Sequence, residues 1–381
     1  MAASHKRRSN GEGAVYETGD GRFRAALIVT HPTTGQQVRR YVSGRTRAET
    51  VRKLDALKKE ATAGGFPGSE TTSEYLARWL VRTRDDVRPS SWRQREQYAR
   101  SYIIPAMGRA SLAKLTPGDV ERMTSGMVAA GKSPTTAAGA RVILRRALAD
   151  ALRDGFVTRN VAALARPPRR TQREIEYLHP AQLRTLLAAC ETDPIGPLVA
   201  VAATTGLRQG ELLGLTWSDV QDGTLTVRRA LARARDGGWE LSPPKTSRSR
   251  RSVRLPAAAV AAFDRQRELQ AQDRAAVGNA WQDVDGIVFT DPVGRYLRGY
   301  NVTKAFQKLL TTAGLPSVPF HALRHSTATA LLSEGVPLRV VADVLGHSTI
   351  VVTANVYAAV VPELRREAAD AMDRALGGDA S

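Results

Sequence analysis

The spacing of apolar and polar residues changes along the chain and marks blocks of different structure. Near the N-terminus, runs such as RFRAALIV and QQVRRYV are short, rich in strand-forming residues and separated by the turn sequences TGDG and PTTG, which predicts three short strands. Thr46 followed by Glu49 forms a capping box, so a helix is expected to begin there. Residues 1–63 therefore predict a small three-stranded sheet with one helix.

The next block, residues 72–165, has only helical spacing. Four of its segments carry apolar residues three and four positions apart, 73–83, 90–105, 117–131 and 133–155. This pattern predicts an all-helical domain. Five of its arginines are candidate phosphate contacts, although each by itself is also an ordinary surface arginine: Arg93, Arg95, Arg141, Arg145 and Arg146.

The last block, residues 176–377, mixes the two kinds of spacing. Helical patterns dominate it, but GTLTVRRALARA, WELS and SVRLP predict a small antiparallel sheet of three strands. Two stretches rich in Gly, Pro or Arg, 64–72 and 165–176, read as linkers. The expected fold class is α+β in several domains: the sheet with its helix, the all-α domain, and a mixed, mainly helical third domain.

The charge of the chain points to a polyanion as its partner. The 381 residues include 56 Lys and Arg against 37 Asp and Glu, a net charge of +19. A basic protein binds a polyanion favourably because each phosphate that it neutralises releases a condensed counterion. A generally basic soluble protein is the alternative. Residues 1–60 alone hold 13 basic and 6 acidic side chains, 13 − 6 = +7. Arg22 and Arg24 alternate with Phe23 and Ala25, so one sheet face is expected to be basic; a merely solvated face is the alternative.

Other classes of protein fit the composition less well. No run of 18 apolar residues exists, so a membrane partner is not expected, and the basic N-terminus lacks the apolar stretch of a secretory signal. The single cysteine, Cys190, lies in a helical pattern and reads as a small core residue. It excludes an internal disulfide and a cysteine-rich zinc site. We therefore expect a protein of the cytoplasm, associated with the nucleoid.

The third block also holds the residues that carry chemistry. They lie in four strings, TTGLRQGELLGLTWSDV (204–220), PKTSRSRRSVRLP (244–256), FHALRHSTATALL (320–332) and VLGHSTIVVTANVY (344–357). The candidate catalytic residues in these strings are Arg208, Lys245, His321, Arg324, His347 and Tyr357.

Together these side chains suit cleavage of a phosphodiester. Two arginines can clamp a phosphate and stabilise the charge of its transition state. A tyrosine, whose ordinary pKa is near 10, needs a base or a positive field to attack, and either histidine can assist. Lys245 is suited to protonate the leaving 5′ oxygen. No metal and no cofactor are expected, because the guanidiniums supply the positive charge.

The strings resemble the tyrosine recombinase (phage integrase) family, whose active site has the order Arg, Lys, His-x-x-Arg, His or Trp, Tyr. The resemblance covers nearly the whole chain and identifies residues 1–63 as similar to an arm-site-binding domain, 72–165 to a core-binding domain and 176–377 to the catalytic domain. It implies a site-specific DNA recombinase that integrates or excises a phage or mobile element through a 3′-phosphotyrosine. It also implies a homotetramer acting on attachment sites, with an excisionase and a host DNA-bending protein as candidate partners.

Several alternatives stay open at this stage. A multimer-resolving recombinase uses the same chemistry but usually lacks the first block, and a relaxing topoisomerase would have a differently arranged chain. A DNA-binding regulator would be expected to have lost a catalytic residue, and a metal-dependent nuclease needs clustered carboxylates.

Neighbouring residues receive lesser roles. Glu211 and Asp219 are expected to be structural partners, and His325 is expected to point elsewhere on its helix. Arg248, Arg250 and Arg251 compete with Lys245 for DNA contact. Residues 348–357 favour a strand by propensity, but the resemblance implies a weak, movable helix, and residues 362–376 predict an amphipathic helix that docks on a neighbouring protomer or on its own core.

Overall fold

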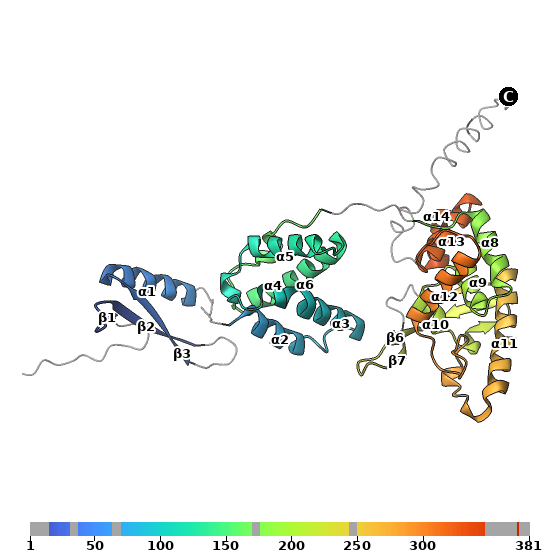
Figure 1. Cartoon of the computed structure of the whole chain (residues 1–381), viewed down its shortest axis with the longest axis horizontal. Helices are drawn as coiled ribbons and strands as arrows, with labels where there is room; N and C mark the ends of the chain where they lie inside the picture. Colours follow the sequence, from blue (N-terminus) through green and yellow to red (C-terminus); the bar gives the residue numbers. More distant parts are fainter. Residues whose placement is uncertain are drawn as a thin grey trace, which may run out of the picture. The chain divides into compact units, whose positions relative to one another are not determined.

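The computed structural model describes residues 15–30, 37–62, 70–169, 176–243, 250–346 and Met372. The chain divides into two compact units, residues 1–172 and 173–381, whose elements are coloured in chain order in Figure 1. Each unit is described by itself. Three candidate catalytic residues lie outside the described residues: Lys245, His347 and Tyr357. The predicted C-terminal helix also lies outside them, apart from Met372.

The first part of unit 1 is a three-stranded antiparallel sheet with one helix, as the sequence predicted. Its elements are β1 (Val15–Glu17), β2 (Phe23–Thr30), β3 (Gln37–Gly44) and α1 (Arg47–Thr62), with the strand order β1-β2-β3. The helix begins as expected, since Glu49 N donates to Thr46 Oγ1 at 3.2 Å. Side chains alternate across β2, so Ala25, Leu27 and Val29 are buried in one small core with Leu54 of α1.

The second part of unit 1 is all helical. Its helices are α2 (Thr72–Arg82), α3 (Pro89–Tyr98), α4 (Ile104–Met107), α5 (Pro117–Ala129), α6 (Pro134–Arg153) and α7 (Val161–Leu164), with a π-helical turn at Ala99–Ile103. Two buried aromatic residues of α2 tie it to α6: Tyr75 Oη donates to Ala147 O at 2.8 Å and Trp79 Nε1 donates to Asp150 Oδ2 at 2.7 Å.

Two of the arginines proposed as phosphate contacts have inward roles instead. Arg95 is 5% exposed, and its guanidinium lies over the ring of Trp79 at 5.3 Å. Arg141 Nη2 donates to the carbonyl of Ala165 at 2.8 Å, which holds the end of the bundle to α6. The prediction was therefore wrong for Arg95, because helical spacing alone did not place this arginine on the aromatic core.

Unit 2 is mainly helical around one buried helix. Its helices are α8 (Pro180–Cys190), α9 (Gly196–Thr205), α10 (Gln209–Leu213), α11 (Ala257–Val277), α12 (Gly299–Thr312), α13 (Ala322–Ser333) and α14 (Leu338–Leu345). Nearly every residue of α9 is buried, and α8, α11 and α13 all pack against it. Such a helix is apolar on all sides, as a core helix must be. Cys190 is buried at the end of α8, as predicted.

The strands of unit 2 differ from the prediction of one three-stranded sheet. They are β4 (Val220–Gln221), β5 (Thr224–Val227), β6 (Ala230–Arg233), β7 (Trp239–Ser242) and β8 (Arg251–Arg254), and they form the sheet β4-β5-β8 and the separate hairpin β6-β7. The ladder breaks at Arg228 and Arg229, whose guanidiniums both reach the buried carboxylate of Asp219, at 3.3 and 3.4 Å. The strand pattern gives no sign of these ion pairs with Asp219.

Gly206 is the point at which α9 ends and approaches α14. Its φ of +63° is left-handed, and an added Cβ would lie 2.3 Å from Leu345 Cδ2. We expect Gly206→Ala to destabilise the protein by about 2–4 kcal/mol, because it adds overpacking to the left-handed backbone cost. Gly335→Ala is the matched control, since Gly335 also has a positive φ of +73° but open space around it. Its expected cost is about 1–2 kcal/mol. Denaturant midpoints measure both, and equal shifts would contradict the close approach.

Candidate active site

The candidate site begins where α9 ends. Arg208 follows the left-handed Gly206 and is the N-cap residue of α10, with extended backbone angles. Its backbone N–H and its Nη1 both donate to the carboxylate of Glu211, at 3.2 and 2.7 Å. Its Nη2 donates to the carbonyl of Gly346 at 2.9 Å. The guanidinium is therefore held by Glu211 of its own helix and by Gly346, 138 residues further along the chain from Arg208, yet the side chain remains 39% exposed and accessible to a ligand.

Arg324 is brought to the same place by α13. Its Nη1 donates to the carbonyl of Gly206 at 2.8 Å, two residues before Arg208. The residue is 3% exposed. Burial, followed by the positive charges of Arg208 and Arg251 and opposed by Glu211, lowers the pKa of Arg324 to about 9. The guanidinium remains charged at neutral pH, so several cations are concentrated around a single carboxylate, which favours binding of an anion.

Glu211 is the buried carboxylate of this cluster. It is 4% exposed and pairs with Arg208 at 2.7 Å and with Arg251 at 3.1 Å. Burial raises the pKa of Glu211, but the charges of Arg251 and Arg208 outweigh that effect, and the pKa is lowered. Glu211 and Asp219 are thus partners of arginines, as the sequence predicted.

His321 is the residue directly before α13, three positions before Arg324. The residue is exposed to solvent on one side. Partial burial of the ring, and then the positive charges of Arg324 and Arg208, lower the pKa of His321 from its usual value of 6.5. His325 was expected to point elsewhere, but its ring contacts that of His321, with centroids 5.5 Å apart and nearly perpendicular planes. One helical turn separates the two histidines, and this spacing could have predicted the contact.

The lowered pKa gives a prediction for His321. In the DNA-free protein its ring should titrate below pH 6.5, so the neutral form should prevail at pH 7 and could accept a proton. Arg208→Met should raise this pKa, because one of the nearby positive charges is removed. Imidazole chemical shifts followed from pH 4.5 to 8 would measure both values. A pKa above 6.5 in the wild type would contradict the environment described here.

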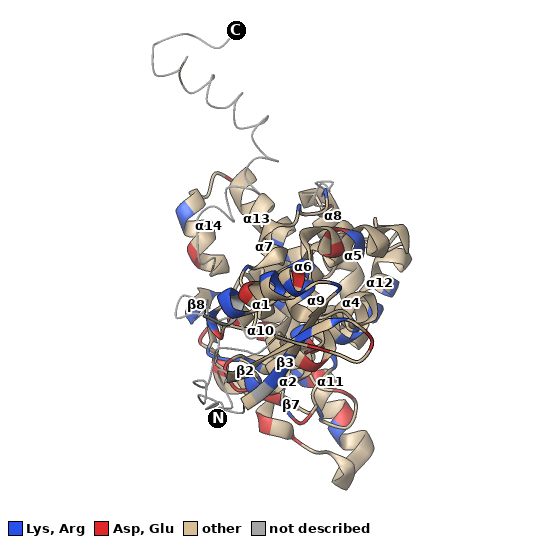
Figure 2. Cartoon of the chain, turned by 90° about the vertical axis from the view of Figure 1, so that its left-hand side faces the viewer, with Lys and Arg blue, Asp and Glu red and all other residues tan. Residues whose placement is uncertain are grey.

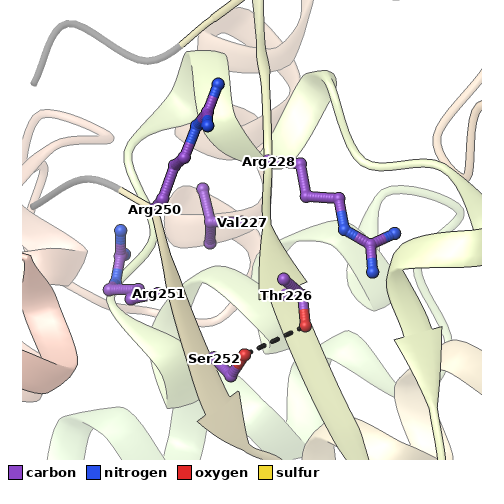
Figure 3. A pocket seen from close by; sticks show the side chains of 6 residues that line it. All are labelled: Thr226, Val227, Arg228, Arg250, Arg251 and Ser252. Carbon is purple, nitrogen blue, oxygen red and sulfur yellow. Dashed lines mark hydrogen bonds between the residues drawn. The ribbon is translucent and has the colours of Figure 1, made fainter. Parts of the chain in front are cut away.

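The strands beside this cluster form a shallow hollow lined by Thr226, Val227, Arg228, Arg250, Arg251 and Ser252 (Figure 3). Thr226 and Ser252 are hydrogen-bonded across it at 3.1 Å. Arg250 is exposed. Arg251 was predicted to compete for DNA contact, and this prediction was wrong: its side chain is 7% exposed and bound to Glu211. The side chains of a strand alternate between faces, and the buried Val253 indicates that Arg251 points inward.

A second basic surface lies on the N-terminal sheet. Basic residues occur on β2, β3 and α1 (Figure 2). The pairing of Arg24 with Ser43 and of Ile28 with Arg39 puts these residues on the face away from the small core. Tyr41 lies between the two arginines on that face, with their guanidiniums 5.2 and 5.7 Å from its ring centre. The expected basic face is present, and it also carries exposed aromatic surface.

Comparison with known proteins places the chain in a family. Residues 176–363 match the phage integrase family, and residues 71–128 match the phage integrase N-terminal SAM-like domain. The chain belongs to the phage integrase family. It is accordingly a tyrosine site-specific recombinase. The family match includes all six candidate catalytic positions within its span.

Relatives match this integrase-family chain over most of their length. A protein named tyrosine recombinase XerC-like, from Caldanaerobacter subterraneus subsp. tengcongensis, is 27% identical, with 92% of this chain and 95% of the relative covered. An integrase from Streptomyces ambofaciens is 29% identical, with 92% and 93% covered.

Solved structures share the fold. The Tn1549 transposon integrase in complex with a circular intermediate DNA has a TM-score of 0.66 at 22% identity, covering 78% of this chain and 99% of that one. A lambda integrase tetramer bound to a Holliday junction has a TM-score of 0.59 at 19% identity, covering 92% and 96%. Among the described residues, no helix has the length and apolar character to cross a membrane, and no cluster of three His, Cys, Asp or Glu could hold a metal.

Proposed function

We propose that this family member is the integrase of a phage or integrative element, which cuts and rejoins double-stranded DNA at attachment sites. The observation that carries the proposal is the cluster of Arg208, Arg324 and His321 around the end of α9. Two guanidiniums and an imidazole lie there, and the sequence supplies a lysine, a histidine and a tyrosine in the order the family requires.

Each residue has a defined task in the proposed reaction. Arg208 and Arg324 hold the scissile phosphate and stabilise its transition state. Tyr357 attacks the phosphorus, its proton passing to His321 or His347, and forms a 3′-phosphotyrosine. Lys245 protonates the leaving 5′ oxygen. The reverse attack by a 5′-hydroxyl of the partner strand releases the tyrosine and reseals DNA, so no external energy source is consumed.

The three folded parts have separate proposed roles. Residues 1–63 read arm-type sites with the exposed face of β2 and β3, residues 72–165 bind the core site, and residues 176–377 contain the catalytic centre. Four protomers act on two duplexes, as the lambda integrase tetramer on a Holliday junction suggests by its shared fold. An excisionase and a host DNA-bending protein remain candidate partners.

The test is covalent trapping on a nicked duplex that carries the protein's own core site. The nick lets a short fragment diffuse away after cleavage, so the enzyme–DNA adduct accumulates. Protease digestion and mass spectrometry should locate the DNA on the peptide that contains Tyr357. An adduct on another residue would overturn the assignment of the nucleophile. Normal binding to a verified core site without any adduct would favour a non-catalytic DNA-binding regulator.

A multimer-resolving recombinase is the second candidate, because the bacterial relative of 27% identity is named XerC-like. The basic sheet face of the N-terminal part favours the integrase. Deletion of residues 1–63 distinguishes the two. We expect it to abolish integration between unlike attachment sites while core-site cleavage persists. A resolving enzyme would recombine two identical core sites without that part.

A further inference from the structure

The C-terminal end of α14 is held by two arginines from other elements. A helix leaves its last carbonyls without partners inside the helix, and cations are favoured at that end. Here Arg251 Nε donates to Val344 O at 2.7 Å, and Arg208 Nη2 donates to Gly346 O at 2.9 Å. Gly346 ends the helix in the left-handed conformation, with φ +68°. The chain therefore leaves α14 at a point fixed by guanidiniums.

Glu211 connects these two arginines. Its Oε1 accepts from Arg208 and its Oε2 accepts from Arg251 at 3.1 Å, and the side chains of Glu211 and Arg251 are only 4% and 7% exposed. Gly346 is pressed against Arg251, since an added Cβ would lie 2.9 Å from Nη1 of that arginine. Arg251 thus joins β8, α10 and the end of α14 in one buried network.

We propose that Arg251 is a positioning residue for the nucleophile. The catalytic roles of Tyr357 and Arg208 are those of the proposed function, on which this inference rests. His347 directly follows Gly346, and Tyr357 lies 357 − 346 = 11 residues beyond it. By binding Val344 O and Glu211 together, Arg251 fixes where that segment begins relative to Arg208. The same side chain keeps Glu211 paired, so that Arg208 presents its remaining donor surface to the phosphate.

Arg251 is buried and bound to α14 and Glu211, whereas the neighbouring arginines are exposed. Figure 3 shows both Arg250 and Arg251 at the start of β8, but Arg250 is exposed. Arg254, at the other end of β8, is also exposed. Loss of either exposed arginine removes the same charge from the same strand without touching α14 or Glu211, and Arg254→Met is therefore the matched control.

The experiment uses the full-length protein on the nicked core-site duplex under single-turnover conditions. We expect Arg251→Met to slow formation of the covalent complex by about 10- to 100-fold, since a small misplacement of a reacting group has effects of this size. The dissociation constant for the duplex, and the final fraction of enzyme that becomes covalent, should stay at the wild-type values. Arg251→Lys should recover part of the rate, and Arg254→Met should retain all of it.

Other roles for Arg251 give different results. A DNA contact would weaken binding and reduce its salt dependence, because one phosphate contact is lost. A purely structural role would lower the covalent fraction and leave the rate constant of the remaining enzyme unchanged. Either result overturns the inference. If the wild type itself forms no adduct, the proposed function fails instead, so the two failures are distinguishable.

A modified substrate tests whether Arg251 acts on the attack by Tyr357 or on protonation of the leaving group. When sulfur replaces the bridging 5′ oxygen at the scissile phosphate, the leaving group needs no proton. Cleavage by a Lys245→Met variant should then recover, whereas cleavage by Arg251→Met should stay slow. Recovery of Arg251→Met on this substrate would show that the arginine acts on proton transfer to the leaving group, and would contradict its role in positioning Tyr357.

Discussion

Replacement of Tyr357 by phenylalanine should abolish the covalent protein–DNA complex and recombination while leaving DNA binding intact. The substitution removes only the hydroxyl that attacks phosphorus, and loss of a catalytic nucleophile costs roughly 10⁴-fold or more in rate. Denaturing gels of the nicked core-site reaction measure the adduct, and a gel-shift titration measures binding.

Tyr300→Phe is the matched control for this experiment. Tyr300 lies at the start of α12 in the same unit and is 78% exposed, so its hydroxyl can be removed without disturbing the core. We expect wild-type amounts of adduct from that variant. An adduct that persists in Tyr357→Phe would mean that another side chain attacks the phosphate, and the catalytic scheme would have to be rebuilt around it.

Replacement of Arg324 by methionine should lower the cleavage rate by about 10²–10³-fold, the usual cost of losing one fixed donor to a transition-state oxyanion. The same substitution should not destabilise the DNA-free protein as strongly as loss of a buried ion pair would. Burial and the positive charges of Arg208 and Arg251 disfavour the charged form of Arg324. The carboxylate of Glu211 and the hydrogen bond to the carbonyl of Gly206 favour it. A methionine of similar length fills the space without a buried charge.

Two measurements check the prediction for Arg324. Single-turnover cleavage gives the rate, and thermal unfolding with and without core-site DNA gives the stability. The variant should melt near the wild type when free and should gain less from DNA, because one phosphate contact is missing. Arg339→Met, which removes an exposed arginine from α14, should match the wild type in both. A fall in free-protein stability with unchanged cleavage would contradict the assignment of Arg324 to the phosphate.

Local sequence determined the elements and the chemistry of this protein. Alternation of residues in β2 defined its buried and basic faces, and Thr46 with Glu49 marked the start of α1. The strings around Arg208, His321 and Arg324 indicated phosphodiester chemistry, because residue types and their short spacing are enough to recognise such groups. The family match agrees with that reading. The catalytic assignment remains a prediction for all six residues, Arg208, Lys245, His321, Arg324, His347 and Tyr357.

Only the tertiary structure decided how distant groups are paired. Strand alternation puts Arg251 on the face of the buried Val253 and Arg254 on the exposed face, but only the packed structure pairs Arg251 with Glu211 and the carbonyl of Val344. Arg228 and Arg229 look like strand residues, but they lie between β5 and β6, where both pair with Asp219. The bonds of Arg208 to Gly346 O and of Arg251 to Val344 O form only after α14 has packed beside α10 and β8. Periodicity along the chain therefore predicts which face of an element is buried, but not which buried partner a charged residue will find there.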